Sequence, residues 1–258
     1  MIPVFILLGL FVGSFLNVCM DRLPQGQSIF RPRSHCSVCK HKLGNLDLIP
    51  IFSYLWLRGR CRYCHAHIPL RLPIIEGVTA LLFALLYWYC KFELSLELGI
   101  SLVYASLLII IFVIDLENHL VLDRITYPAM ALALGFSFFW PGLIGLDRVP
   151  GEALPRILSS LAGGALGLAA MALPYILTHR RGMGLGDVKL GALVGLMTGF
   201  PLVFVAILLS WIGGGLVAVI LLALKVKKLK DPIPSATFLA TSAMVTLLWG
   251  QAIWQWYL

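Results

Sequence analysis

Residues 107–114 read Leu-Leu-Ile-Ile-Ile-Phe-Val-Ile, and this apolar run ends at Asp115. A second abrupt change stands at residues 184–187, Gly-Leu-Gly-Asp, where Asp187 begins another apolar stretch. A carboxylate at the edge of a membrane span is costly to desolvate, so it is a candidate functional group. These two places indicate a membrane-embedded fold and a first pair of candidate site residues.

The composition of the chain agrees with a membrane-embedded fold. Of its 258 residues, 60% are hydrophobic and only 12% are charged, and the mean hydropathy is +0.92. Soluble domains are about half apolar and a quarter charged. Lipid admits only helices or closed barrels, and apolar runs of about twenty residues are too long for barrel strands. We therefore predict an all-α polytopic membrane protein of about eight transmembrane helices, at residues 2–20, 73–90, 96–114, 125–144, 156–177, 187–200, 202–224 and 235–256.

The basic residues are concentrated in alternate loops. If the N-terminus is outside, the cytoplasmic segments hold 17 of the 20 Lys and Arg residues, and these segments are 21–72, 115–124, 178–189 and 225–234. Cytoplasmic loops of membrane proteins carry such an excess, so this orientation is predicted. It places Asp115 and Asp187 at the same depth on the cytoplasmic side. A basic face near anionic lipid headgroups accounts for the net charge of +8 without a nucleic-acid partner.

One long hydrophilic stretch divides the chain into three predicted parts. Residues 1–20 form a first transmembrane helix, residues 21–72 a cytoplasmic insertion, and residues 73–258 a transmembrane helical bundle. The first segment lacks the basic start and the cleavage site of a signal peptide, so we interpret it as a retained helix. No internal repeat is evident in the sequence.

The insertion carries two Cys-x-x-Cys pairs, Cys36 with Cys39 and Cys61 with Cys64, separated by 21 residues. Four thiolates suit a tetrahedral Zn²⁺ ion and leave no open position on it, so the predicted zinc is structural. A segment of this size has little core, and metal binding would supply folding free energy. Disulfides are the alternative, but a cytoplasmic segment is kept reduced. We interpret the nearby histidines as surface residues, although one could replace a cysteine ligand: His35, His41, His65 and His67.

Asp115 and Asp187 could together perform the chemistry of an aspartic protease. Two carboxylates about 3 Å apart share one proton, so that one can activate water while the other polarises a carbonyl group. Glu117 and Asp123 are rival acids in the loop after Asp115. Asp123, next to Arg124, is more typical of a helix N-cap or an ion-pair partner. The plainer interpretation of all these acids is a solvated flank of a membrane helix.

Further motifs follow one another along the chain. They are Gly13-Ser14-Phe15-Leu16-Asn17-Val18, Arg33-Ser34-His35-Cys36 leading into the cysteine pairs, Arg71-Leu72-Pro73-Ile74-Ile75-Glu76, the Asp115 segment continuing to Leu122-Asp123-Arg124-Ile125-Thr126-Tyr127-Pro128, and Gly184-Leu185-Gly186-Asp187-Val188-Lys189-Leu190. In this order they resemble the type IV prepilin peptidase family, membrane aspartic proteases of the GxGD class. The resemblance covers nearly the whole chain.

The resemblance implies an enzyme that cuts the basic leader from prepilins and pseudopilins at the cytoplasmic face of the bacterial inner membrane. Asp115 and Asp187 would be its catalytic pair. Members with the cysteine-bearing insertion commonly also N-methylate the new N-terminal residue with S-adenosylmethionine, so we predict both activities, with the peptidase alone as the alternative. The candidate residues for binding this cofactor are Asn17, Arg22, Arg33 and Glu76. Their plainer roles are helix packing, lipid-headgroup contact and ion pairing.

One segment departs from the family pattern. The family often has a Pro-Phe-Gly-Pro-like stretch before the last helix, whereas residues 233–238 of this chain read Ile-Pro-Ser-Ala-Thr-Phe. Two other functional classes stay open. One is a transporter with an aspartate relay, although such relays usually lie near the bilayer midplane. The other is an assembly subunit of a secretion machine that docks through its zinc knuckle.

Overall fold

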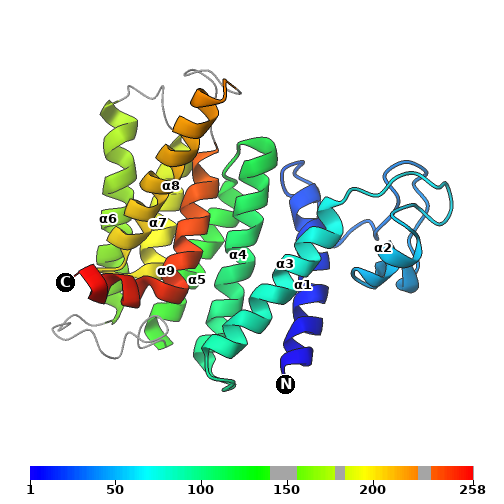
Figure 1. The fold of residues 1–258 in the computed structure, drawn as a ribbon, viewed down its shortest axis with the longest axis horizontal. Coiled ribbons are helices and arrows are strands. Elements are labelled where there is room, and N and C mark those ends of the chain that lie inside the picture. Colours follow the sequence, from blue (N-terminus) through cyan, green and yellow to red (C-terminus); the bar gives the residue numbers. More distant parts are fainter. Residues whose placement is uncertain (140–155, 178–183, 226–233, 258) are drawn as a thin grey trace. The chain divides into compact units, whose positions relative to one another are not determined.

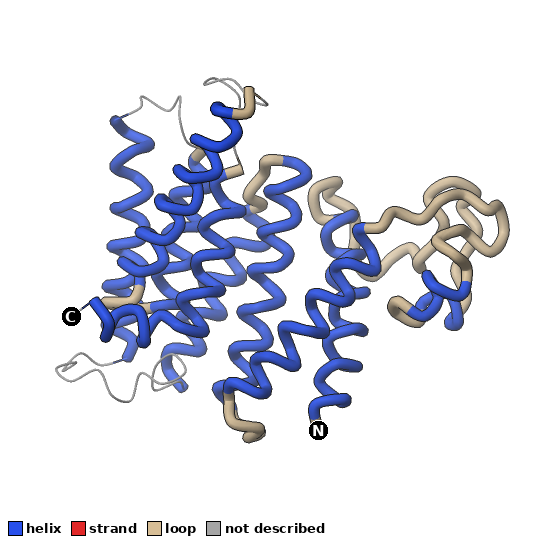
Figure 2. Tube along the Cα trace, viewed as in Figure 1, coloured by secondary structure: helices blue, strands red, loops and turns tan. Residues whose placement is uncertain are grey.

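The computed structural model describes residues 1–139, 156–177, 184–225 and 234–257. These residues form helices joined by loops, and their pairing between extended segments is limited to two isolated bridges (Figures 1 and 2). The chain forms two compact units, Met1–Leu98 and Gly99–Leu258. The all-helical fold class is therefore confirmed for the described part of the chain.

The first unit is built on two helices that pack side by side, α1 (Ile2–Arg22) and α3 (Arg71–Tyr89) (Figure 1). Glycines on α1 permit the close approach: a Cβ on Gly9 would lie 2.5 Å from the Cα of Ala80. One turn along, a Cβ on Gly13 would lie 2.7 Å from the Cα of Glu76. Small residues commonly allow membrane helices to approach in this way.

The insertion between α1 and α3 is mostly loop (Figure 2). It contains the short 3₁₀ helix η1 (Asn45–Leu48) and the single-turn helix α2 (Phe52–Trp56). Its two isolated bridges pair His35 with Lys42 and Arg60 with His67, and each bridge closes a loop that holds one cysteine pair. The insertion is thus organised around the cysteines rather than around an apolar core.

The second unit is a helical bundle with one helix at its centre. The central helix is α7, which packs against α5, α6, α8 and α9 and buries most of its residues. This setting explains why α7 is apolar on nearly every face. The bundle consists of α4 (Leu96–Asn118), α5 (Asp123–Phe139), α6 (Arg156–Leu177), α7 (Leu185–Thr198), α8 (Val203–Ala223) and α9 (Ser235–Tyr257).

A helix lies at each of the eight places predicted from the sequence, but not all eight are long enough to span a membrane. Six described helices are long and apolar enough to cross: α1, α3, α4, α6, α8 and α9. Helix α7 has 14 residues, fewer than the roughly 17 that a span needs. Helix α5 is described for 17 residues, and the rest of its predicted span, 140–144, lies outside the described residues. The number of spans stays a prediction, whereas the multi-pass helical architecture is confirmed.

Candidate functional site

Asp115 lies in the last turns of α4 and is almost fully buried, with 4% of its surface exposed. Its Oδ2 accepts two hydrogen bonds from one residue, Thr237. The backbone N–H of Thr237 donates over 2.7 Å and its hydroxyl over 2.8 Å, although the two residues are 122 positions apart. Thr237 belongs to the first turn of α9, where backbone N–H groups have no partner within the helix. The buried carboxylate is therefore stabilised by a helix N-terminus.

Asp187 lies in the first turn of α7 and is also buried, with 8% exposed. The backbone N–H of Gly184 donates to its Oδ2 over 3.2 Å. The Ser235 side chain and the charge of Asp115 both lie close enough to act on the Asp187 carboxyl group. The structure thus brings together the two aspartates predicted from the sequence and adds two residues that sequence reasoning missed, Ser235 and Thr237. The only signal for them was the departure at residues 233–238.

The rival acids lie outside this pair. Glu117 and Asp123 are exposed, and Asp123 forms an ion pair with Lys189 of α7, with 2.6 Å between Oδ1 and Nζ. The same ammonium group lies 5.1 Å from the centre of the Tyr127 ring. The predicted ion-pair role of Asp123 is consistent with this contact, but the partner is Lys189 rather than the adjacent Arg124.

The second glycine of the Gly-Leu-Gly-Asp motif has a packing role. A Cβ on Gly186 would lie 2.7 Å from the Cβ of Val121, which belongs to the loop between α4 and α5. A Cβ on Gly184 would meet nothing nearer than 3.8 Å. Gly186 therefore lets the loop after Asp115 pack against the turn before Asp187, which keeps both aspartates in one region.

The four cysteines of the insertion converge on one point. Their Sγ atoms all lie within 4.8 Å of one another, and the Sγ atoms of Cys36 and Cys64 are 3.8 Å apart. Four sulfurs around one Zn²⁺ ion at about 2.3 Å each would be separated by about 3.8 Å. The geometry therefore fits a tetrahedral metal ion. Among the described residues these four form the one group of this kind. Of the four histidines predicted to lie at the surface, His41, His65 and His67 are exposed and His35 is half-buried.

The two cysteine loops share one backbone design, which the sequence did not reveal. In the first loop the N–H of Cys36 donates to His41 and the N–H of Lys40 donates back to Cys36. In the second loop the N–H of Cys61 donates to the carbonyl of Ala66, and the N–H of His65 donates to the carbonyl of Cys61. Lys40 and His65 also share a positive φ, 57° and 56°. The insertion thus contains a structural repeat, two matching knuckles that each present a cysteine pair.

The knuckle backbone favours thiolate in part of the cluster. The N–H of Cys39, followed by further backbone and thiol contacts, lowers the pKa of Cys36 to about 6 despite the cost of burial. At Cys64 the N–H of Ala66 acts in the same direction, but burial and the neighbouring thiols raise the pKa to about 11. Four thiols this close cannot all ionise easily, because neighbouring thiolates repel one another. A bound cation would offset this repulsion and stabilise the thiolate form of all four.

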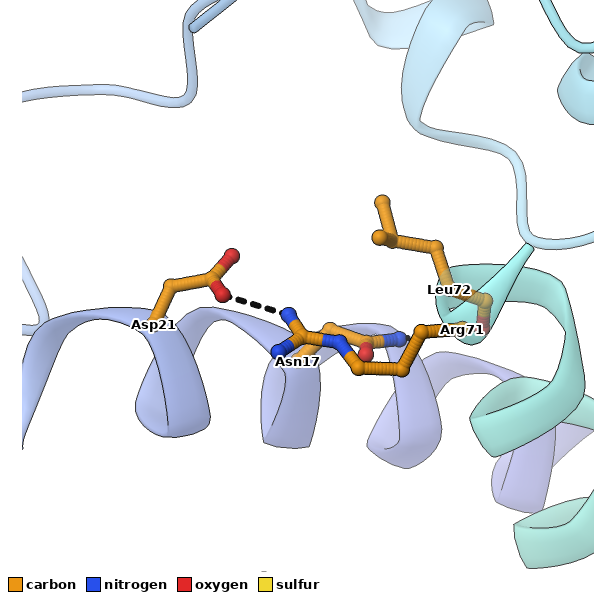
Figure 3. Close-up of polar contacts among 4 residues, drawn as sticks. All are labelled: Asn17, Asp21, Arg71 and Leu72. Atoms are coloured by element: carbon orange, nitrogen blue, oxygen red, sulfur yellow. Dashed lines mark hydrogen bonds and ion pairs between the residues drawn. The ribbon is translucent and has the colours of Figure 1, made fainter. Parts of the chain in front are cut away.

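Three of the four residues predicted to bind the methyl donor have structural contacts in the first unit. The amide nitrogen of Asn17 donates to the carbonyl of Leu72 over 3.1 Å, beside the ion pair of Asp21 with Arg71 (Figure 3). Arg22 is buried and donates to backbone carbonyls of the following loop.

Glu76 accepts the N–H of Ile51 over 2.7 Å, and the Ser14 side chain lies close enough to act on the Glu76 carboxyl group. Ile51 has a φ of 58°, unfavourable for a β-branched residue, so Glu76 holds a strained turn at the start of α2. The fourth residue, Arg33, is exposed in the insertion. The structure therefore brings Asn17 and Glu76 to the seam between α1 and α3, whereas Arg33 belongs to the insertion.

Comparison with known proteins places the chain in a family. The model of the type IV leader peptidase family matches residues 102–219, and the model of the bacterial peptidase A24 N-terminal domain matches residues 7–90. The chain belongs to the type IV leader peptidase family. The two matches follow the two compact units, since the boundary at Leu98 falls between them. The cysteines thus lie in the N-terminal domain and both aspartates in the peptidase domain.

Curated relatives cover almost the entire chain. Proteins named prepilin leader peptidase/N-methyltransferase from Aeromonas hydrophila and Bacillus subtilis are each 33% identical to it. The alignments cover 98% of this chain and 92% of the Aeromonas protein, and 100% and 98% for the Bacillus protein. A Pseudomonas aeruginosa protein of the same name is 32% identical over 98% of this chain and 92% of its own length. No solved structure matches the chain.

Proposed function

We propose that the protein cleaves the basic leader peptide of type IV prepilins and pseudopilins and then N-methylates the new N-terminal residue with S-adenosylmethionine. Its family and the names of relatives that align along nearly its whole length support both activities. The observation that carries the peptidase proposal is a pair of buried aspartates, Asp115 and Asp187, on two helices and within range of each other's charge. Two buried apolar side chains would stabilise the fold better than two buried carboxyl groups, so the carboxyl pair indicates a function rather than a structural role.

The proposed cleavage uses the pair as acid and base. Of two neighbouring carboxyl groups one is ionised and the other protonated, because two charges about 3 Å apart are costly. The ionised group takes a proton from water, whose oxygen attacks the scissile carbonyl carbon, while the other group donates its proton to the carbonyl oxygen. The tetrahedral species then loses the amine, which leaves with a proton returned by a carboxyl group.

The proposed setting is the cytoplasmic face of the bacterial inner membrane. The loop charges favour an orientation in which the last turn of α4 and the first turn of α7 both lie at that face. A prepilin presents its basic leader on the cytoplasmic side and its apolar helix in the bilayer, so a site at this edge can reach the bond between them. Lipid and the prepilin are thus the expected partners.

We propose Zn²⁺ as the metal and assign it a structural role. Cys36, Cys39, Cys61 and Cys64 would hold it, and four thiolates complete its coordination. The metal would supply a cross-link between the two knuckles. On this proposal the first unit consists of α1, a zinc-bearing insertion and α3, and the second unit is the bundle with the peptidase site.

The proposed methyl-transfer site lies in the first unit. S-adenosylmethionine would supply an electrophilic methyl group for the new N-terminal amine. The seam between α1 and α3 offers one feature suited to a polar ligand there, since the Oδ1 of Asn17 is buried and accepts no hydrogen bond. Glu76 lies on the same seam, whereas Arg22 would act from the last turn of α1 and Arg33 from the adjoining loop.

Asparagine substitution tests the peptidase proposal. Asp115→Asn and Asp187→Asn keep the size of the side chain but remove its acid–base function, so each should lower the rate of leader cleavage by at least about a hundredfold. Product masses from purified full-length protein and a prepilin, with S-adenosylmethionine, report cleavage and methylation separately. Asp123→Asn is the matched control, because it removes an exposed acid at the start of α5, outside the aspartate pair. Substantial cleavage by Asp187→Asn would contradict the assignment.

A further inference from the structure

The first turn of α9 contacts both aspartates of the proposed site. Thr237 donates its N–H and its hydroxyl to Asp115, and the Ser235 side chain lies close enough to act on the Asp187 carboxyl group. This turn lies beyond residues 102–219, the part that matches the family model, and within the stretch that departs from the family pattern. The family match therefore does not cover the polar residues of this turn.

The two bonds from Thr237 fix the orientation of the Asp115 carboxylate. Both donors converge on Oδ2, at 2.7 and 2.8 Å. A carboxylate with two donors on one oxygen cannot rotate about its last bond without breaking both of them. The direction of Oδ1 is therefore fixed as well.

The turn also links the two aspartates to each other. Ser235 and Thr237 are two residues apart in one helix, so the distance between their polar groups is set by local helix geometry. Helices α4 and α7 each contribute one aspartate, and catalytic groups must be held within about 0.5 Å of their productive positions. A short rigid turn that touches both carboxyl groups meets this need.

We infer that the first turn of α9 is the positioning element of the aspartate pair, with Thr237 orienting Asp115 and Ser235 orienting Asp187. This inference rests on the proposed peptidase function. Both are positioning residues, because they contact the carboxyl groups and need not contact the substrate. Their loss should disturb the geometry of the pair while substrate binding elsewhere persists.

The test compares three variants of the full-length protein. Thr237→Val keeps the shape and the backbone N–H but removes the hydroxyl, and a hydrogen bond to a charged group is worth enough to lower kcat by about ten- to a hundredfold. Thr237→Ser restores the hydroxyl and should return kcat to within about threefold of the wild type. Thr241→Val is the matched control, since the Thr241 hydroxyl lies one turn further along α9 and donates to the backbone carbonyl of Thr237. The KM for prepilin should stay within about twofold in all three.

Each result decides the question. A wild-type kcat for Thr237→Val, or a loss that appears in KM alone, overturns the inference. An equal loss in Thr241→Val also overturns it, because the effect would then be a general one on α9. If Thr237→Val does not fold, judged by thermal unfolding, Ser235→Ala takes its place, and it must lower kcat about tenfold while Ser235→Thr restores it. If Asp115→Asn still cleaves the prepilin, the proposed peptidase function is wrong. If the aspartate variants are inactive but Thr237→Val is fully active, the proposed function stands and only this inference is wrong.

Discussion

At the scale of single residues, the site depends on what is small as much as on what is charged. Asp115 and Asp187 supply the proposed chemistry, but Gly186 allows the loop that follows Asp115 to pack against the turn that carries Asp187. The contact is between Gly186 and the side chain of Val121. The two glycines of the motif therefore differ in role, although their spacing in the sequence makes them look alike.

This difference predicts unequal effects of alanine at the two positions. Gly186→Ala places a Cβ 2.7 Å from the Val121 Cβ, so the loop must shift, and a displacement near 1 Å can cost about a hundredfold in cleavage rate. Gly184→Ala meets nothing nearer than 3.8 Å and should retain clearly more activity. Steady-state cleavage of a prepilin measures both.

A double variant identifies the cause of the Gly186 effect. Val121→Gly removes the atom that the new Cβ would strike, so it should restore part of the activity lost in Gly186→Ala. If the double variant is as slow as the single one, crowding against Val121 is not the reason for the glycine.

At the scale of helices, the second unit depends on backbone contact between α6 and α7. A Cβ on Gly195 would lie 2.0 Å from the carbonyl oxygen of Gly163, and one on Gly167 would lie 2.1 Å from that of Gly191. Gly163 and Gly167 are four residues apart on α6, and Gly191 and Gly195 are four residues apart on α7. Gly163 therefore faces Gly195, and Gly167 faces Gly191. This close packing fixes α7, and with it the position of Asp187.

Alanine at this interface should therefore loosen the bundle. Gly195→Ala forces α6 and α7 apart, and overpacking of this kind costs about 1–3 kcal/mol in the free energy of unfolding. Gly215→Ala on α8 is the control, because a Cβ there meets nothing within 4 Å, and it should not destabilise the protein. Reversible unfolding in detergent measures both. Equal stability of the two variants would show that the interface can relax.

At the scale of the whole molecule, the two compact units correspond to the two family domains and carry different chemistry. Both aspartates and the α9 turn lie in the second unit, and the cysteine cluster lies in the first. Both units contain helices that pack closely at glycines, and the first unit also contains the paired knuckles. The two proposed activities should therefore respond differently to damage in one unit.

Removal of the cysteines should separate the activities. Cys36→Ser with Cys39→Ser takes away half of the proposed zinc ligands, so bound zinc should fall from about one per chain to near zero. Methylation should be lost first, while leader cleavage persists, because the aspartates lie in the other unit. Metal analysis measures the bound zinc, and product masses measure cleavage and methylation. Cys90→Ser is the control, and zinc that stays at one per chain in the double variant would show that the ligand set is wrong.

The sequence by itself determined the helices and the cysteine cluster. Apolar runs near twenty residues can only be helical in lipid, so the eight helices lie where the hydropathy predicts them. The cysteine pairs were equally predictable, because a two-residue gap brings both thiols of a pair to one side of a turn. Asp115 and Asp187 could be predicted as candidates from charge and motif, since a carboxylate at a membrane edge is rare.

Only the tertiary structure decided which residues meet. Contacts between helices depend on their rotation and tilt, and an apolar pattern that covers nearly every face of α7 encodes neither. For this reason the sequence did not predict that Thr237, 122 positions away, binds Asp115, or that Asp123 pairs with Lys189. The matching knuckles were hidden because they are a repeat of backbone hydrogen bonds rather than of side chains. The residue types were enough to predict the chemistry, whereas the geometry that this chemistry requires arises from the packing of the helices.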